Sequence, residues 1–136
     1  MSSTVRTSSP ARSGYRLWFL VDGLVTGANA VLYLLLNQLL PELIGGTSPL
    51  YLTVGIFLLV VTVGLLVVAR SGGRPAALAW VLVVINFLWA VASFVIAAVN
   101  PFGLNGFGVA WTVAQGLIVL AFGIFQARAL RTSPRG

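Results

Sequence analysis

The 136-residue chain is too apolar for a water-soluble domain, because 59% of its residues are hydrophobic, only 7% are charged and the mean hydropathy is +1.03. Cysteine, histidine and lysine are all absent. Their absence excludes disulfides, thiolate chemistry and metal or haem sites built from thiolate or imidazole ligands, so we expect no metal and no cofactor. The composition instead predicts an integral membrane protein.

Apolar runs in chain order predict membrane-spanning helices at about residues 17–40, 50–69, 76–99 and 107–127. At roughly 1.5 Å per residue, each run is long enough to cross a bilayer core of about 30 Å. Helix is required because lipid offers no partners for backbone groups, and the runs lack the alternation of a β-barrel. Short connections with proline and glycine make neighbours antiparallel. The predicted fold class is an all-α membrane protein, an antiparallel four-helix transmembrane bundle.

The arginines predict the orientation of this bundle. All eight basic residues are arginines, and they lie before residue 17, between residues 70 and 74, and after residue 127. The positive-inside rule then places both termini in the cytoplasm of a multi-pass plasma-membrane protein. We expect a disordered cytoplasmic tail at 1–14, a transmembrane domain at 15–130 and a basic cytoplasmic tail at 131–136. Anionic lipid headgroups are the expected partners of the arginines, and nucleic acid is not, because no aromatic residues are interleaved with them.

The first run could also be a secretory signal peptide, since Ala28-Asn29-Ala30 resembles a small-residue cleavage site. Asp22 would interrupt the apolar region of such a signal, so we favour a membrane span. On a helical wheel the polar residues of this run share one narrow arc: Asp22, Thr26, Asn29, Tyr33 and Asn37. Beside the arc, Gly23 and Gly27 form a G-x-x-x-G step that allows close helix packing, either within the bundle or against a second copy.

Polar residues also mark one face of the third and fourth runs. Asn86 continues through Ser93 in the third, and Gln115 shares a face with Trp111, Phe122 and Gln126 in the fourth. From their positions within the runs, Asn29, Asn86 and Gln115 should lie at similar depth in the bundle interior, packed beside Trp89 and Trp111. The second run carries only Thr53 and Thr62 as polar residues besides its ends, so we expect it to have the largest lipid contact.

Asp22 is the single carboxylate within a predicted span. An unpaired carboxylate at the bilayer centre would cost about 2.5 to 3.5 kcal/mol on insertion scales, but Asp22 lies near the start of its helix, where an arginine side chain can reach it. We therefore favour an ion pair with Arg16, Arg74 or Arg128 over a functional carboxylate. Glu42 falls in the first connection, where a solvated surface position is expected.

Four short motifs carry a resemblance to a known kind of protein: Asp22-Gly-Leu-Val-Thr-Gly-Ala-Asn29, Asn86-Phe-Leu-Trp89, Trp111-Thr-Val-Ala-Gln115 and Phe122-Gly-Ile-Phe-Gln126. Together they resemble small uncharacterised four-span integral membrane proteins of high-GC Gram-positive bacteria. The resemblance implies a four-helix fold in a bacterial membrane and no particular activity. It also implies an aspartate before Ser93, where this chain has Ala92.

The function predicted from these features is that of a non-enzymatic membrane component, an accessory or packing part of a homo-oligomer or larger membrane complex. The alternative is a minimal transporter or binder of a small lipophilic molecule, with a site among Asp22, Asn29, Asn86 and Gln115. An enzyme is the least favoured class, because no nucleophile has a histidine, a lysine or a second carboxylate to activate it.

Overall fold

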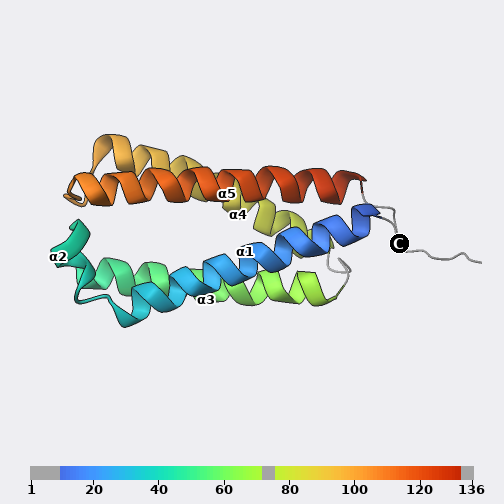
Figure 1. The fold of residues 1–136 in the computed structure, drawn as a ribbon, viewed down its shortest axis with the longest axis horizontal. Coiled ribbons are helices and arrows are strands. Elements are labelled where there is room, and N and C mark those ends of the chain that lie inside the picture. Colours follow the sequence, from blue (N-terminus) through green and yellow to red (C-terminus); the bar gives the residue numbers. More distant parts are fainter. Residues whose placement is uncertain (1–9, 72–75, 133–136) are drawn as a thin grey trace, which may run out of the picture.

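The computed structural model describes residues 10–71 and 76–132, and they form an all-α fold. Its helices, shown in Figure 1, have the following bounds: α1 Pro10–Leu35, α2 Leu40–Ile44, α3 Ser48–Arg70, α4 Ala76–Val99 and α5 Gly106–Thr132. Four of them, α1, α3, α4 and α5, are long and apolar enough to cross a membrane. They pack as an antiparallel bundle, which confirms the predicted fold class.

The first candidate span begins at Arg16, next to the predicted residue 17, but the helix that contains it starts earlier and the span ends earlier than predicted. Helix α1 begins at Pro10, within the segment assigned to the tail, while residues 1–9 lie outside the described part of the chain. At the other end α1 stops at Leu35, whereas the apolar run had suggested residue 40. Asn37 accounts for the earlier end, because its Nδ2 donates to the Leu34 carbonyl at 2.8 Å and its Oδ1 accepts from the Ser48 hydroxyl. These bonds favour a turn in place of further helix.

Helices α1 and α3 form a tightly packed pair. A Cβ atom on Gly23 would lie 2.8 Å from Leu66 Cδ2, and one on Gly27 would lie 3.2 Å from Thr62 Cγ2. On α3, a Cβ atom on Gly55 would lie 2.8 Å from Leu34. The G-x-x-x-G step is therefore used inside this chain, against α3.

Helices α4 and α5 form the second pair, again through glycines. A Cβ atom on Gly116 would lie 2.8 Å from the Phe94 ring, and one on Gly123 would lie 3.2 Å from the Phe87 ring. The two glycines are seven residues apart, two helical turns, and so are their aromatic partners. Each aromatic ring thus rests on a glycine of α5, which lets the two backbones run close together.

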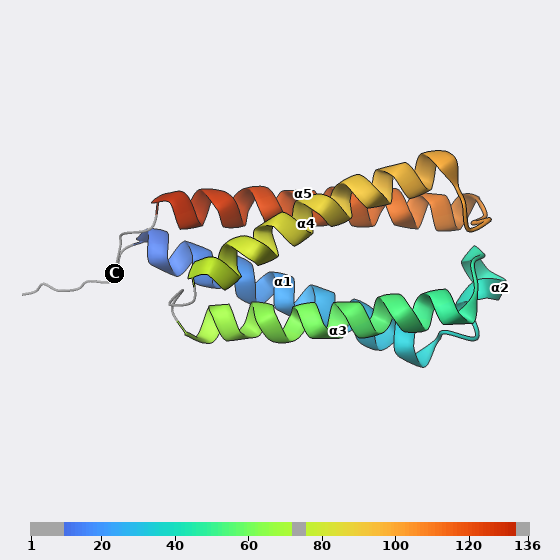
Figure 2. The same ribbon diagram turned by 180° about the vertical axis from the view of Figure 1, so that it is seen from behind.

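The two helix pairs lie close together at the end where α1 begins and α5 ends, and they diverge toward α2 (Figures 1 and 2). At the closed end an apolar core lies between the pairs, beside the buried polar side chains of Asp22 and Gln126, and its main residues are Phe19, Leu65, Val68, Ala79, Leu82 and Val83. At the open end α2 connects the pairs, because Asn105 donates through its side chain to the Leu43 carbonyl at 2.8 Å and through its backbone to the Ile44 carbonyl at 3.0 Å. At this end the short helix α2 therefore links the two helix pairs through hydrogen bonds.

The expectation that the second span has the largest lipid contact is wrong. In its most apolar window, 39% of the residues of α3 are buried, against 22% for α5. Helix α3 packs against α1 along much of its length and also touches α4, where Phe57 stacks on Trp89 with ring centroids 5.5 Å apart. Apolar side chains can pack against lipid or against protein, so composition alone did not distinguish the two environments.

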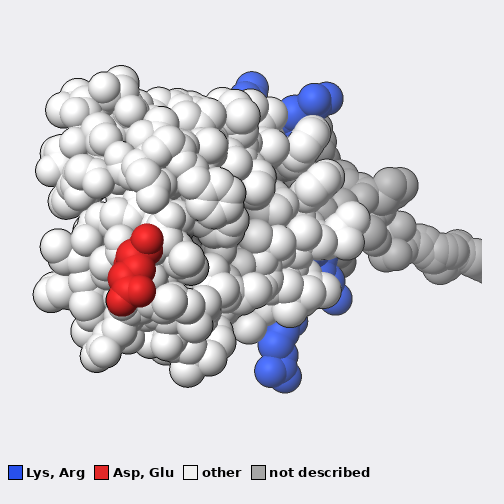
Figure 3. Space-filling view, turned by 60° about the vertical axis from the view of Figure 1, so that its left-hand side comes forward, with Lys and Arg blue, Asp and Glu red and all other residues white. Residues whose placement is uncertain are grey.

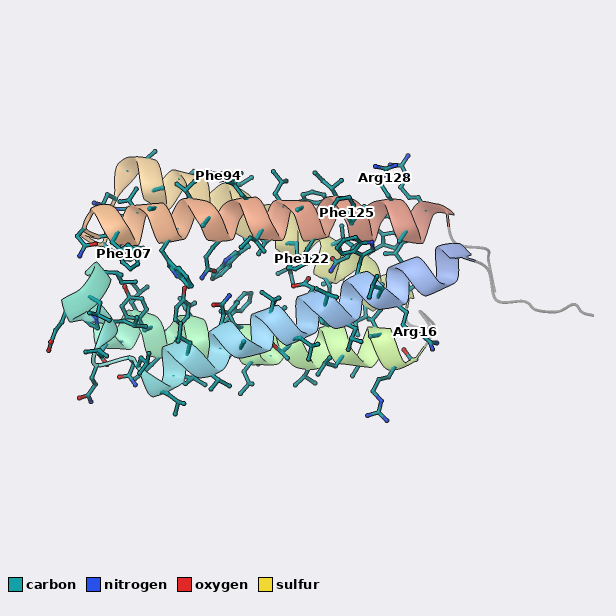
Figure 4. All side chains as sticks on the ribbon, viewed as in Figure 1. Arg16, Phe94, Phe107, Phe122, Phe125 and Arg128 are labelled. Carbon is teal, nitrogen blue, oxygen red and sulfur yellow. The ribbon has the colours of Figure 1, made fainter. Side chains whose placement is uncertain are left out.

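The exposed charged side chains of the described bundle lie at its two ends, whereas Asp22 is buried within it. Arg16, Arg70, Arg128 and Arg131 lie at the closed end, while Glu42 lies on α2 at the opposite end. Figure 3 shows this separation, and Figure 4 places Arg16 and Arg128 at the end remote from Phe107. Between these two ends the described residues expose no charged side chain, as a membrane-spanning region requires.

Candidate functional site

Asp22 lies at the centre of a buried hydrogen-bond cluster that joins three helices. Its Oδ1 accepts from the Thr26 hydroxyl at 2.8 Å, and its Oδ2 accepts from Asn86 Nδ2 at 2.8 Å and from Gln126 Nε2 at 2.7 Å. Asn86 Nδ2 also donates to Gln126 Oε1 at 2.9 Å. Asp22 and Gln126 are both 0% exposed. We call these four residues the Asp22 cluster.

The partners of Asp22 differ from the ion pair that we expected with Arg16, Arg74 or Arg128. Its three observed hydrogen-bond donors are neutral, a hydroxyl and two amides. Arg74 lies outside the described residues. The partner from α5 is Gln126, where Arg128 was expected. The reason is the register of the antiparallel helices α1 and α5, which sets Gln126 directly opposite Asp22. The carboxylate is thus held inside the bundle by the chain's own dipoles.

A second cluster lies further along α1, at Tyr33. The Tyr33 hydroxyl accepts two hydrogen bonds from α5, from Trp111 Nε1 at 2.9 Å and from Gln115 Nε2 at 2.9 Å. Its ring also packs against Tyr51 of α3, with centroids 5.6 Å apart. We call Tyr33, Trp111 and Gln115 the Tyr33 cluster.

The prediction that Asn86 and Gln115 lie at similar depth is wrong. Asn86 pairs with Asp22 and Gln115 pairs with Tyr33, and these two positions on α1 are about 16 Å apart along the helix. The same spacing separates Gln126 from Gln115 on α5, so one antiparallel register explains both clusters. Of the proposed site residues Asp22, Asn29, Asn86 and Gln115, the pair joined by a described hydrogen bond is Asp22 and Asn86.

Two cavities lie between the helix pairs. The α2-end cavity has a volume of about 90 Å³, and its wall includes Tyr33, Tyr51, Ser93 and residues from α2, α4 and α5. The mid-bundle cavity has a volume of about 70 Å³ and extends toward Thr26 and Phe122, the latter labelled in Figure 4 between α5 and α1. Both cavities are lined by Trp89, Trp111 and Gln115, so these three side chains stand between them. No charged side chain lines either cavity in the part of the chain that the structure describes.

The predicted site residues are divided among these features. Gln115 lines both cavities, and Asn29 lines the mid-bundle cavity without joining either cluster. Asp22 and Asn86 line neither cavity and reach the mid-bundle one only through Thr26, which bonds to Asp22. Ala92, where the resemblance implies an aspartate, is exposed on α4. Its replacement of aspartate therefore alters neither cavity wall.

Sequence reasoning had placed Tyr33, Trp111, Ser93 and Gln126 on polar faces without assigning them to a site. For Tyr33 the sequence did contain a signal of an interior position, because Tyr33 lies on the polar arc of α1, four residues after Asn29. What the sequence could not supply is the register between α1 and α5, which decides that Tyr33 meets Gln115 and that Asp22 meets Gln126.

No protein-family model matches the chain, and neither a curated protein nor a solved structure matches it. The candidate site therefore stands on its own geometry: an antiparallel bundle with four candidate membrane spans, a closed polar cluster at Asp22, and two cavities that meet at Trp89, Trp111 and Gln115.

Proposed function

We propose that this chain is a non-enzymatic membrane protein that binds a small lipophilic molecule between its two helix pairs. One observation carries the proposal, the aromatic α2-end cavity of about 90 Å³ with Tyr33 and Gln115 in its wall. Ligand sites in proteins are typically concave and mostly apolar, with a few polar groups that fix orientation, and helical bundles place them between helices. The cavity has each of these properties.

The test is a thermal-unfolding screen of the purified protein against neutral lipids, quinones and lipophilic cations. A ligand present at 100 times its dissociation constant should stabilise the native state by about 2.7 kcal/mol. Gln115→Leu should abolish the response, because Gln115 lines both cavities, whereas Asn86→Leu should keep it, because Asn86 lines neither. Each variant is compared with its own unliganded midpoint. A compound that stabilises the wild type and Gln115→Leu equally would contradict the proposed site.

The competing proposal is an accessory or packing component of a homo-oligomer or larger membrane complex. The Asp22 cluster supports it, since a network whose members bond to one another acts as structural glue between helices. This proposal predicts that no compound in the screen shifts the unfolding midpoint, and that a partner protein or a second copy co-purifies from native membranes.

We further propose that both termini face the cytoplasm of a bacterial plasma membrane, as the one-sided arginines and the resemblance to four-span proteins of high-GC Gram-positive bacteria suggest. The exposed arginines would then contact anionic headgroups, at about 1 kcal/mol each. A cysteine introduced at Ser71 should be protected from an impermeant thiol reagent in intact cells, and one at Thr47 should react. The opposite pattern would reverse the orientation.

A further inference from the structure

Tyr33 brings an unpaired hydrogen-bond donor to the wall of the α2-end cavity. Its hydroxyl oxygen accepts from both Trp111 and Gln115, yet its own hydrogen has no acceptor among the residues that the structure describes. The side chain is only 6% exposed. Rotating the Gln115 amide by half a turn would let Tyr33 donate to Oε1, but would leave the amide N–H groups free instead. Either assignment leaves a donor unpaired at the cavity.

Ser93 adds a second unpaired hydroxyl to the same wall. Ser93 is 5% exposed and, within the described ranges 10–71 and 76–132, its hydroxyl makes no hydrogen bond. Two other hydroxyls on these helices do find a partner in the turn before them, since the buried Thr62 donates to the Leu58 carbonyl at 2.7 Å and the half-buried Thr112 donates to the Gly108 carbonyl at 2.9 Å. The Ser93 hydroxyl differs from both in having no such bond.

Unpaired donors are unfavourable at this location because the surrounding lipid cannot accept hydrogen bonds. A bound molecule with an oxygen atom would satisfy both hydroxyls at once. When that oxygen is itself a hydroxyl, its hydrogen can be donated to Gln115 Oε1, which accepts no bond from any described residue. The wall thus offers two hydroxyl donors and one amide acceptor, and an alcohol group can bond to all three.

Charge and volume narrow the class of molecule further. The described lining residues are all uncharged, so a charged ligand would be buried without a counterion. An apolar cavity of about 150 Å³ is known to hold benzene, so about 90 Å³ suits the oxygen end of a chain better than a ring. The cavity is partly open, which leaves a path for the rest of the chain toward lipid.

We propose that the α2-end cavity binds the polar end of an uncharged long-chain alcohol, whose oxygen accepts from Tyr33 Oη and Ser93 Oγ and whose hydrogen is donated to Gln115 Oε1. The inference rests on the proposed function and specifies its ligand class. Trp89 and Trp111 line the same cavity, so they report on its occupancy.

The experiment measures quenching of tryptophan fluorescence in phosphatidylcholine nanodiscs by octadecanol that carries bromine on its second and third carbons. Octadecane and octadecyltrimethylammonium with the same bromination are the control probes. We expect the quenching by the alcohol to reach saturation as its concentration rises. Quenching by the alkane and by the ammonium compound should rise linearly, because these two probes only partition into the lipid. Trp111→Phe should lose much of the saturable part, and Trp18→Phe should keep it, because Trp18 stacks on Phe125 away from the cavity.

Ser93→Ala is the decisive variant, because it removes a hydroxyl without breaking any described protein hydrogen bond. The substitution should weaken the binding of the alcohol by about 3- to 10-fold, the usual effect of losing one hydrogen bond. Thr62→Val is the matched control, since it deletes a buried hydroxyl that lines neither cavity, and it should leave the affinity unchanged.

The remaining outcomes separate the inference from the function on which it rests. If the alkane saturates as tightly as the alcohol and Ser93→Ala has no effect, lipophilic binding stands and the alcohol inference is overturned. If the cation saturates most tightly, the inference is also overturned. If no probe saturates, the proposed function fails together with the inference, and the cavity holds water or lipid only.

Discussion

Asn86→Leu should destabilise the bundle more than Gln115→Leu, although both replace a buried amide by leucine. Asn86 Nδ2 donates to Asp22 and to Gln126, so leucine removes both bonds and leaves Gln126 Oε1 without its donor. Interhelical hydrogen bonds in membranes average about 0.6 and reach about 1.7 kcal/mol. An orphaned buried acceptor costs about 1 to 3 kcal/mol more. The expected loss for Asn86→Leu is therefore about 2 to 4 kcal/mol.

Gln115→Leu removes a single bond, to a Tyr33 hydroxyl that still accepts from Trp111, so its expected loss is about 0.5 to 1.5 kcal/mol. Equilibrium unfolding of both variants in mixed micelles, followed by far-ultraviolet circular dichroism, measures the difference. The midpoints of the two ranges differ by about 2 kcal/mol, so at about 1.4 kcal/mol per factor of ten the folded-to-unfolded ratios should differ by about 30-fold. Equal losses, or a larger loss for Gln115→Leu, would refute the assignment of Asn86 to the Asp22 cluster.

Further substitutions test the packing and the separation of the two clusters. Gly108→Ala should lower the unfolding midpoint by displacing α2, because its Cβ would collide with the Ile44 carbonyl, whereas Gly106→Ala meets open space and should be neutral. Gly27→Leu should reduce the yield of folded protein, because even a Cβ atom at this position would press on Thr62. Leu24→Ala, at a residue that is 62% exposed, should change the yield little. Equal losses would show that the wrong face of α1 has been assigned to the contact with α3. Asp22→Asn should lower stability yet respond to every ligand as the wild type does, since Asp22 lines neither cavity, and a lost response in the thermal screen would give this carboxylate a functional role.

The spans could be predicted from the sequence because bilayer thickness imposes a minimum length on any apolar run that crosses it. Helix α2 could not, since Leu39 and Leu40 continue the apolar run of α1 and a five-residue helix has no periodicity of its own. The break at Leu35 depends on Asn37 meeting Ser48, a contact between the turn after α1 and the first residue of α3. Local sequence shows that Asn37 is polar but not what it will bond to.

The polar faces could likewise be predicted, whereas the pairings across them could not. Asn29, Asn86 and Gln115 were expected in the interior; Asn86 and Gln115 are buried, whereas Asn29 is only half-buried. Which of them meet depends on how far one helix slides past another, and that register is set by glycine contacts such as Gly123 under Phe87. A shift of one helical turn would exchange every partner without changing the pattern in any single helix.

The most direct test of the proposed binding site is photo-crosslinking with a long-chain alcohol that carries a diazirine next to its hydroxyl group. Insertion sites in the purified protein are mapped by mass spectrometry, with and without excess octadecanol. Binding between the helix pairs predicts competed insertion at cavity-wall residues such as Tyr51, Trp89 and Trp111. Insertion confined to exposed positions such as Val60 and Leu88, and unaffected by the competitor, would contradict it.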